Sequence, residues 1–196
     1  MCFAGKNHSV VKLNQGLRGI AGKSAAPREA CPSTAKKKMH KINPIGIIHS
    51  PHKSIEDMPI QPKGASEVAG HIVVNEEYID GLQDLDGFSH IYLLYSFHQA
   101  IRTEMHVIPF MDSQTRGVFA TRSPLRPNHI GISVVNLIGI EGNKIFVKGI
   151  DILDGTPLLD IKPYIKEFDV VQDSVSGWLH ASDEEIRKKR SDERFL

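Results

Sequence analysis

Short runs of β-branched and aromatic residues recur along this chain, and proline, glycine or an Asp/Asn turn ends most of them. A chain interrupted so often by turn-forming residues is expected to form many short strands. The runs that we interpret as strands are residues 45–50, 70–75, 88–98, 105–110, 132–140, 144–150 and 158–164. Residues 88–98 are nearly all apolar, which predicts a strand buried on both faces.

Helical signals are few. Asn75 is expected to cap a helix that ends near Gly87, and Ser182 is expected to cap another close to the C-terminus. Many short strands with one or two short helices predict a mainly β protein, a single-sheeted β-barrel with small additions.

Charge divides the chain unevenly. Residues 1–41 carry nine Lys/Arg and one Glu, whereas the remainder carries 15 Lys/Arg and 22 Asp/Glu. This leader is rich in Gly, Ala, Ser and Lys and has no periodicity, so we expect a disordered basic extension over 1–41. Both cysteines lie in it, and a core without disulfides indicates a reducing, cytoplasmic location. No apolar run approaches the ~20 residues of a membrane span, so we expect no membrane association.

The segment from Gly117 to Gly131 is the strongest candidate for a binding loop. Residues 118, 119 and 121 begin it like a strand, and Pro124 and Pro127 then prevent ladder pairing. Arg122 and Arg126 on such a stiff loop could clamp an anion with little ordering cost. Alternatively, these arginines pair with carboxylates elsewhere in the fold.

Two further loop positions carry polar side chains at predicted strand ends. His98 and Gln99 follow the apolar strand, where they suit a polar ligand, although a half-buried structural histidine is the alternative. Asp151 and Asp154 flank a turn that could bind a cation or ribose hydroxyls, or could simply form a good Asp-Gly turn.

Several chemistries lack their sequence signals. The chain has no phosphate-binding Gly-x-x-x-x-Gly-Lys, no Gly-x-Gly-x-x-Gly and no His-Glu-x-x-His. His90, His98 and His106 lie too far apart along extended chain to share a metal, so we expect no metal site. Asp160 and Lys162 lie on one side of a strand and are expected to pair with each other.

Four segments of the chain resemble the TsaA-like family, whose characterised members are tRNA methyltransferases. They are Phe88-Ser-His90, Phe97-His-Gln99, Phe119-Ala-Thr-Arg-Ser-Pro-Leu-Arg-Pro-Asn-His-Ile-Gly131 and Asp154-Gly-Thr-Pro-Leu-Leu-Asp-Ile-Lys-Pro-Tyr164. The resemblance implies a dimerising β-barrel over residues 42–168, followed by a C-terminal tail over 169–196 with a short helix. It also implies S-adenosylmethionine as methyl donor and N6 of threonylcarbamoyladenosine, beside the tRNA anticodon, as acceptor.

Carried onto this chain, the resemblance implies a set of cofactor-binding residues in loops that the strand pattern had already singled out, Ile132 excepted. The set is Pro59, Ile60, Gln61, His98, Gln99, Arg122, Ile132, Asp151, Ile152, Leu153 and Asp154. His98 is the candidate catalytic proton acceptor. The candidate tRNA-binding residues are Arg116, Arg126, Lys162 and Lys166.

Two other functions stay open at this point. One is a barrel that binds S-adenosylmethionine or RNA without catalysis. The other is an enzyme acting on a small nucleotide, such as a phosphohydrolase, which the lack of clustered metal-binding carboxylates disfavours.

Overall fold

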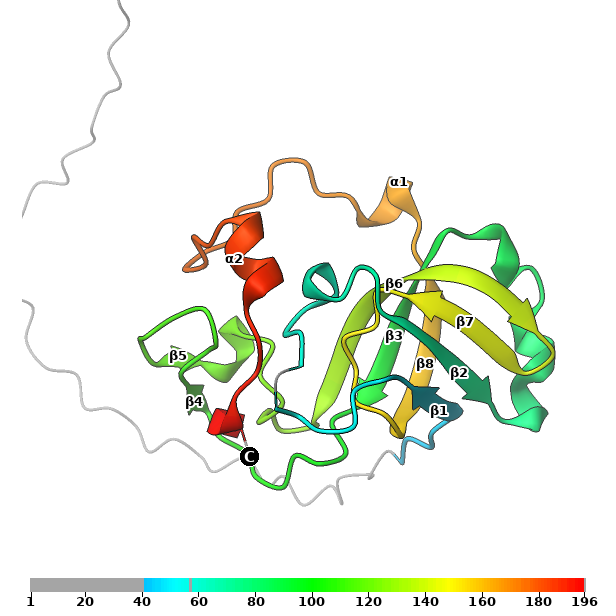
Figure 1. Cartoon of the computed structure of the whole chain (residues 1–196), viewed down its shortest axis with the longest axis horizontal. Helices are drawn as coiled ribbons and strands as arrows, with labels where there is room; N and C mark the ends of the chain where they lie inside the picture. Colours follow the sequence, from blue (N-terminus) through cyan, green and yellow to red (C-terminus); the bar gives the residue numbers. More distant parts are fainter. Residues whose placement is uncertain (1–40, 57, 196) are drawn as a thin grey trace, which may run out of the picture. The chain divides into compact units, whose positions relative to one another are not determined.

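Six antiparallel strands close into a barrel in the order β1-β2-β7-β6-β3-β8, with β8 pairing back to β1 (Figure 1). The computed structural model describes residues 41–56 and 58–195, so the predicted disorder of residues 1–40 lies outside it. The barrel strands are β1 Gly46–His49, β2 Ala69–Val74, β3 His90–Ser96, β6 Ile130–Glu141, β7 Lys144–Lys148 and β8 Thr156–Pro163. The predicted fold class, a mainly β barrel with short helices, is confirmed.

Alternate residues of the strands fill the barrel. On β3, Ile91 and Leu93 are fully buried and Tyr95 is 6% exposed, whereas Tyr92 and Leu94 are only half-buried. The prediction that this strand is buried on both faces is therefore wrong. A closed barrel has one packed interior, and here the outer face of β3 lacks the covering layer of helices that parallel sheets have.

Two turns follow the predicted chemistry. Gly142, with φ of 59°, connects β6 to β7 as a tight hairpin, and Gly155, with φ of 75°, precedes β8. Both positions need the left-handed conformation that glycine adopts without strain.

The predicted helix from Asn75 to Gly87 is instead two 3₁₀ segments, η2 Glu76–Leu82 and η3 Leu85–Gly87. The side chain of Asn75 does not cap η2 but donates to the carbonyl of Pro44 at 3.3 Å. Asp84 separates the segments with φ of 63°. Gly81 and this left-handed residue oppose a continuous α-helix, and Leu82 and Leu85 pack against the core from the shorter turns.

Residues 105–117 do not continue the barrel as predicted. β4 His106–Val107 pairs only with β5 Arg116–Gly117, in a separate two-stranded sheet. The strand expected at residues 118–121 is a 3₁₀ turn, η4 Val118–Ala120, in which Val118 is buried and Phe119 is 76% exposed. A further short turn, η1 Pro62–Gly64, lies in the loop between β1 and β2.

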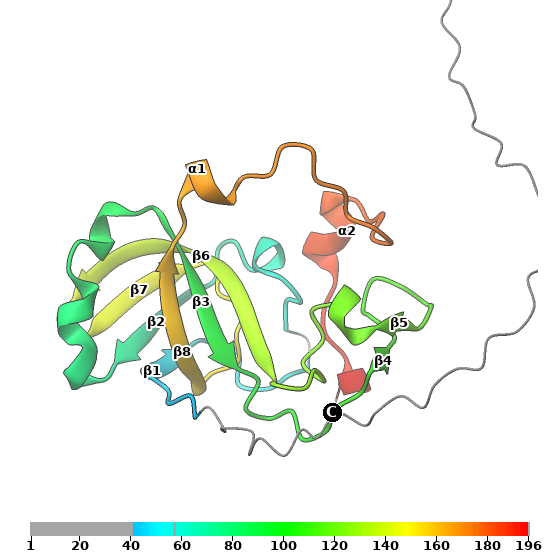
Figure 2. The same ribbon diagram turned by 180° about the vertical axis from the view of Figure 1, so that it is seen from behind.

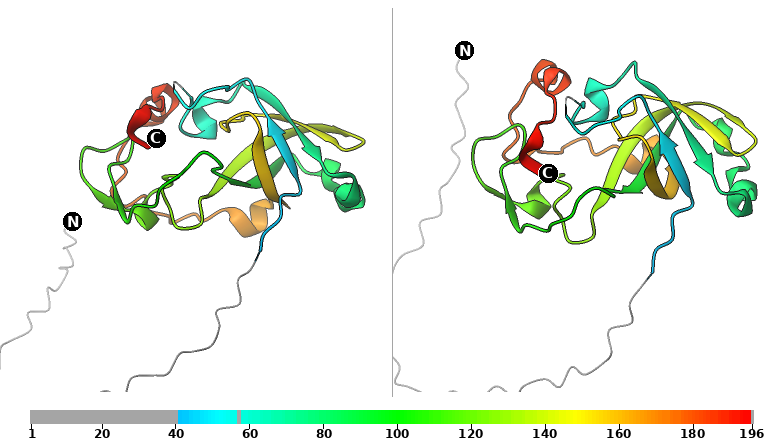
Figure 3. Two further views of the ribbon diagram at one scale, coloured as in Figure 1. Left: turned by 90° about the horizontal axis from the view of Figure 1, so that it is seen from below. Right: turned by 60° about the horizontal axis from the view of Figure 1, so that its bottom comes forward.

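After β8 the chain forms α1 Lys166–Asp169 and then a segment, residues 171–195, that we term the C-terminal arm. The arm contains α2 Asp183–Lys188 and η5 Glu193–Phe195. Ser182 caps α2 through a capping box with Glu185, as predicted. Figures 2 and 3 show the arm running beside the loop before β2 and beside β4 and β5. Among the described residues, no helix is both long and apolar enough to cross a membrane.

Candidate functional site

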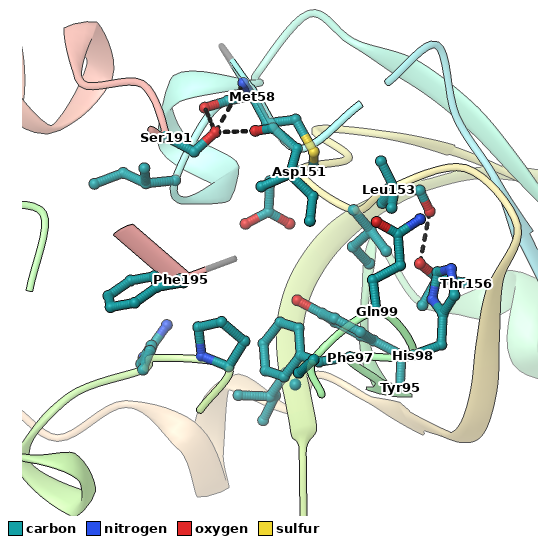
Figure 4. A pocket seen from close by; sticks show the side chains of 18 of the residues that line it. Met58, Tyr95, Phe97, His98, Gln99, Asp151, Leu153, Thr156, Ser191 and Phe195 are labelled. Atoms are coloured by element: carbon teal, nitrogen blue, oxygen red, sulfur yellow. Dashed lines mark hydrogen bonds between the residues drawn. The ribbon is translucent and has the colours of Figure 1, made fainter. Parts of the chain in front are cut away.

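A pocket of about 180 Å³ opens where the loops before β2, after β3, before β6 and before β8 meet (Figure 4). We term it the central pocket. It contains all but one of the predicted cofactor-binding residues, namely Pro59, Ile60, Gln61, His98, Gln99, Arg122, Ile132, Asp151, Ile152 and Leu153. Segments far apart in the sequence therefore converge at one site, as the prediction required.

Asp154 is the exception, because it does not line the central pocket. Its carboxylate binds Lys53 Nζ at 2.6 Å, accepts from the backbone N–H of Ser50 at 3.1 Å and lies 3.4 Å from His49 Nδ1. The hydrogen bond from Lys53 is the main reason why the pKa of Asp154 falls to about 2. These contacts fasten the turn before β8 to the end of β1, so the structure supports the turn-forming alternative for this residue.

Asp151 has the opposite environment. Figure 4 shows its carboxyl group pointing into the pocket, between Phe195 and the rings of Phe97 and Tyr95. Ser133 Oγ donates to Oδ1 at 2.7 Å and itself lies 3.2 Å from the hydroxyl of Tyr95. Burial among apolar side chains is the main cause that raises the pKa of Asp151 to about 6, although the Ser133 hydrogen bond opposes it.

Arg122 supplies the positive charge of the pocket. Its guanidinium donates to Gln61 Oε1 at 3.0 Å, which joins two predicted ligand-binding loops. Arg122 also stabilises the Asp151 carboxylate electrostatically and so acts against the burial effect on the pKa of Asp151. The pocket thus presents the Asp151 carboxylate and the guanidinium groups of Arg122 and Arg126 within largely apolar walls, an arrangement suited to a zwitterionic ligand.

Arg126 does not form the predicted two-arginine clamp. Its guanidinium donates to the carbonyls of Ser123 at 2.9 Å and Thr121 at 2.5 Å, so its donors hold the loop backbone together. His129 adds a contact to the Pro124 carbonyl at 2.8 Å. One of the two arginines of this loop is therefore used to bind the loop's own carbonyl groups.

The remaining basic residues that were predicted to bind tRNA lie on separate elements. Arg116, on β5, binds Asp112 Oδ2 at 2.7 Å, and Lys162, on β8, binds Asp160 at 2.9 Å, which confirms the expected pairing of those two strand residues. Lys166 begins α1 and is exposed. The structure does not gather these groups around the central pocket.

His98 and Gln99 are exposed at the pocket rim, where the chain leaves β3. Figure 4 places both near Leu153 and Thr156, to one side of the Asp151 carboxyl group. Within the described part of the chain, no group of three or more His, Cys, Asp or Glu side chains could hold a metal ion.

Sequence reasoning missed the inner wall of the pocket. Tyr95 and Phe97 meet edge to face with ring centroids 5.4 Å apart, and Gly131 lies against both rings. A Cβ atom at Gly131 would overlap the Tyr95 ring. Phe97 and Gly131 stood inside recognisable motifs, but only the register of β3 against β6, with Tyr95 opposite Gly131, reveals the contact.

The C-terminal arm supplies a second set of missed residues, Ser191 and Phe195. The backbone N–H of Ser191 donates to the Met58 carbonyl at 2.9 Å, and Ser191 Oγ accepts from the Met58 N–H at 3.0 Å and donates to the Ile55 carbonyl. Phe195 packs edge to face on Phe110 at 4.8 Å. The sequence gives no motif for Ser191 and Phe195. Their contacts are with residues more than 80 positions away, and a local pattern does not record such contacts.

Comparison with known proteins agrees with the fold and the site. Residues 47–170 match a family model described as the tRNA-methyltransferase O N-terminal domain. A protein of Pyrococcus abyssi, named as a probable S-adenosyl-L-methionine-binding protein, is 51% identical over 153 residues, covering 78% of this chain and 83% of its own length. A mouse tRNA (adenine(37)-N6)-methyltransferase is 36% identical over 138 residues, covering 66% of this chain and 32% of its own.

Among solved structures, TrmO from Pseudomonas aeruginosa superposes with a TM-score of 0.61 at 39% identity, covering 71% of this chain and 62% of that chain. This chain therefore spans less than two thirds of the solved TrmO chain. The family match covers more than half of the sequence, and the expected resemblance to the TsaA-like family is confirmed. The chain belongs to the tRNA-methyltransferase O N-terminal domain family.

Proposed function

We propose that this protein is an S-adenosylmethionine-dependent tRNA methyltransferase that acts on N6 of threonylcarbamoyladenosine next to the anticodon. The observation that carries the proposal is the presence of both Asp151 and Arg122 in the lining of one largely apolar pocket. S-adenosylmethionine has an ammonium, a sulfonium and a carboxylate, so a pocket for it needs both signs of charge. The names of the family and of its relatives support this assignment.

The donor set of the pocket fits this cofactor. Asp151 would face a positive group, because a half-buried carboxylate whose pKa is raised gains most from a nearby cation. Arg122 would bind the carboxylate, with Gln61 holding the guanidinium in place. The rings of Tyr95 and Phe97 and the side chains of Ile152 and Leu153 would cover apolar parts of the ligand.

When bound, the cofactor supplies a methyl group already activated by the sulfonium for in-line displacement. The protein then has to position the acceptor nitrogen and exclude water. That nitrogen lies between a purine ring and a carbonyl and becomes a good nucleophile only as its proton leaves. We propose His98, at the pocket rim, as the proton acceptor.

The tRNA contacts are a separate part of the proposal. Arg116, Lys162 and Lys166 would bind backbone phosphates, the first two by exchanging their carboxylate partners for phosphate. Arg126 would act indirectly, by keeping the Arg122 loop rigid. We also propose a cytoplasmic homodimer, supported by Ile132 and Ile138 on β6, which are 45% and 61% exposed. Light scattering after gel filtration tests that assembly: a single-chain mass at micromolar concentration contradicts it.

The test of function uses the purified full chain, S-adenosylmethionine and tRNA from cells lacking this modification. We expect saturable cofactor binding by calorimetry and a new N6-methylated nucleoside by mass spectrometry. Cofactor binding without methylation of any tRNA favours the non-catalytic binding module. Absence of cofactor binding rejects both functions. His98→Ala, compared with His106→Ala outside the pocket, should slow methylation by more than it weakens cofactor binding if His98 takes the proton.

A further inference from the structure

A second cavity, of about 650 Å³, adjoins the central pocket. It lies between the C-terminal arm, the 118–124 turn, η1 and the segment after β4. The two cavities share wall residues, which are Ile60, Gln61, Phe110, Arg122, Pro124 and Phe195. A ligand in the second cavity would therefore be separated from the central pocket by little more than the side chains of this common wall.

The lining of this cavity suits a nucleobase. It includes four aromatic rings, those of Phe110, Phe119, Trp178 and Phe195, and among its described lining residues there is no Asp or Glu. Lys63 and Arg122 are the cations in that lining. Apolar and aromatic walls with a positive edge favour a flat base attached to a phosphodiester backbone, because the rings stack and the cations attract phosphate.

Phe119 is the ring best placed to stack on such a base. It is 76% exposed at the cavity wall, although it follows Val118, which is buried. The turn that carries Phe119 is held in place by Arg126, because the guanidinium of Arg126 donates to the carbonyl of Thr121 at 2.5 Å. An aromatic ring held outward on a stiff turn loses little freedom when a base stacks on it.

The arm completes the cavity on the opposite side. Trp178 Nε1 donates to the Ala120 carbonyl at 2.8 Å, and the Arg116 guanidinium lies 5.6 Å from the centre of the indole ring. Lys63 Nζ binds Asp183 at 2.5 Å, which ties α2 to η1. The residues of the arm lie beyond the family match, which ends at residue 170, so this wall is an addition to the family domain.

We propose that the second cavity receives the acceptor adenine of the RNA substrate, stacked on Phe119 and enclosed by the arm. This inference rests on the proposed function and deepens it, since it assigns a subsite to the acceptor base next to the methyl donor. The cofactor also carries an adenine, and the central pocket proposed for the cofactor shares a wall with the second cavity. The experiment must therefore separate the two adenines.

The test compares the wild-type chain with Phe119→Ala, Phe119→Tyr and a matched control, Ile42→Ala, which removes an exposed apolar side chain before β1, outside both cavities. Affinity for undermethylated tRNA is measured by fluorescence anisotropy, and affinity for S-adenosylmethionine by calorimetry. A base stacked on an aromatic ring contributes enough that Phe119→Ala should weaken tRNA binding about 5- to 150-fold. We expect Phe119→Tyr and Ile42→Ala to bind tRNA like the wild type, and all variants to bind the cofactor within about twofold.

Other outcomes overturn the inference in distinguishable ways. Loss of cofactor affinity in Phe119→Ala with unchanged tRNA affinity reassigns the cavity to the cofactor's own adenine. Unchanged tRNA affinity together with unchanged cofactor affinity removes the base from the cavity while leaving the proposed function intact. Wild-type protein that binds no cofactor rejects the proposed function, and wild-type protein that binds the cofactor but no tRNA rejects both the tRNA methyltransferase activity and the subsite.

Ultraviolet cross-linking of the same tRNA gives a second readout that does not depend on a variant. Cross-linked peptides that contain Phe119 or Trp178 support the subsite. Cross-links confined to the β8–α1 region, near Lys162 and Lys166, contradict it, because they place the RNA on a different part of the surface.

Discussion

The barrel and the C-terminal arm are built on different principles. Strand pairing and a packed interior hold the barrel, where residues such as Ile48, Leu93 and Ile145 are fully buried. Over residues 171–195, by contrast, every described residue is at least partly exposed, and the arm is held by backbone and side-chain hydrogen bonds, ion pairs and ring contacts. The arm nevertheless walls both cavities. The difference teaches that, in this molecule, a segment with no buried residue over 171–195 can still form the walls of a site.

The largest loss of stability is expected when a side chain of the barrel core is truncated. Leu93→Ala leaves a cavity in the barrel interior and should lower the free energy of unfolding by about 2–5 kcal/mol, as measured by urea denaturation. Val175→Ala, at a position in the arm that is 92% exposed, is the control and should change it by less than about 0.5 kcal/mol. Similar losses at both positions contradict the division between barrel and arm.

Asp151→Asn should have the opposite sign, because the site and not the fold requires this carboxylate. The folded state raises the pKa of Asp151 from 3.8 to about 6, so it retains the proton at higher pH than the unfolded chain does. Wild-type stability should therefore fall as the pH rises from about 4 to about 6. The variant should lack that slope and gain roughly 1–2 kcal/mol of stability at pH 7, a figure reduced for partial exposure.

The measurement for Asp151→Asn is thermal or urea unfolding at several pH values, paired with calorimetry for S-adenosylmethionine. We expect greater stability together with weaker cofactor binding. Asp154→Asn is the matched control in the same turn. The pKa of Asp154 is lowered, so this variant should lose stability at neutral pH and approach the wild type only as the pH falls towards about 2. Identical behaviour of the two variants contradicts the assigned environments.

Loosening the arm should give the smallest effect on stability. Ser191→Ala removes the hydroxyl that accepts from the Met58 N–H and donates to the Ile55 carbonyl, two hydrogen bonds at the half-buried edge of the pocket. We expect the free energy of unfolding to fall by no more than about 1 kcal/mol. Hydrogen exchange should nevertheless quicken in the 55–64 loop and in the arm, and leave the barrel strands protected. Ser174→Ala, at an exposed arm position, should change neither quantity.

The sequence predicted the barrel, and it singled out loops that the fold brings together at one pocket, because strand patterns and turn residues are local signals. The Asp-Gly turn before β8 and the Ser182 cap formed as expected. The failures share a physical cause, namely tertiary partners that local patterns do not encode. Residues 118–121 form a turn whose Thr121 carbonyl accepts a hydrogen bond from the Arg126 guanidinium. The Asp154 carboxylate does not line the pocket, because it binds Lys53 and the backbone N–H of Ser50.

The same limit applies to the site. Apolar runs identified β3 and β6 as strands, but the contact of Gly131 with the Tyr95 ring depends on strand register. The arm had only a helix cap as a signal, and its contribution to the pocket comes from single contacts to distant loops. A search for isolated aromatic residues near the end of the chain would have drawn attention to Trp178 and Phe195 without indicating their partners.

Closure of the barrel also bears on how the chain folds. β1 and β8 pair with Gly46 opposite Leu158, so the seam joins residues separated by most of the domain. Searching for so remote a partner costs loop entropy before any pairing energy is recovered, and sheets with such distant pairings fold in milliseconds to seconds. Until that seam forms, β1 and β8 each expose an unpaired edge to other chains. The step that closes the barrel is therefore also the one that removes these exposed edges and protects the chain from aggregation.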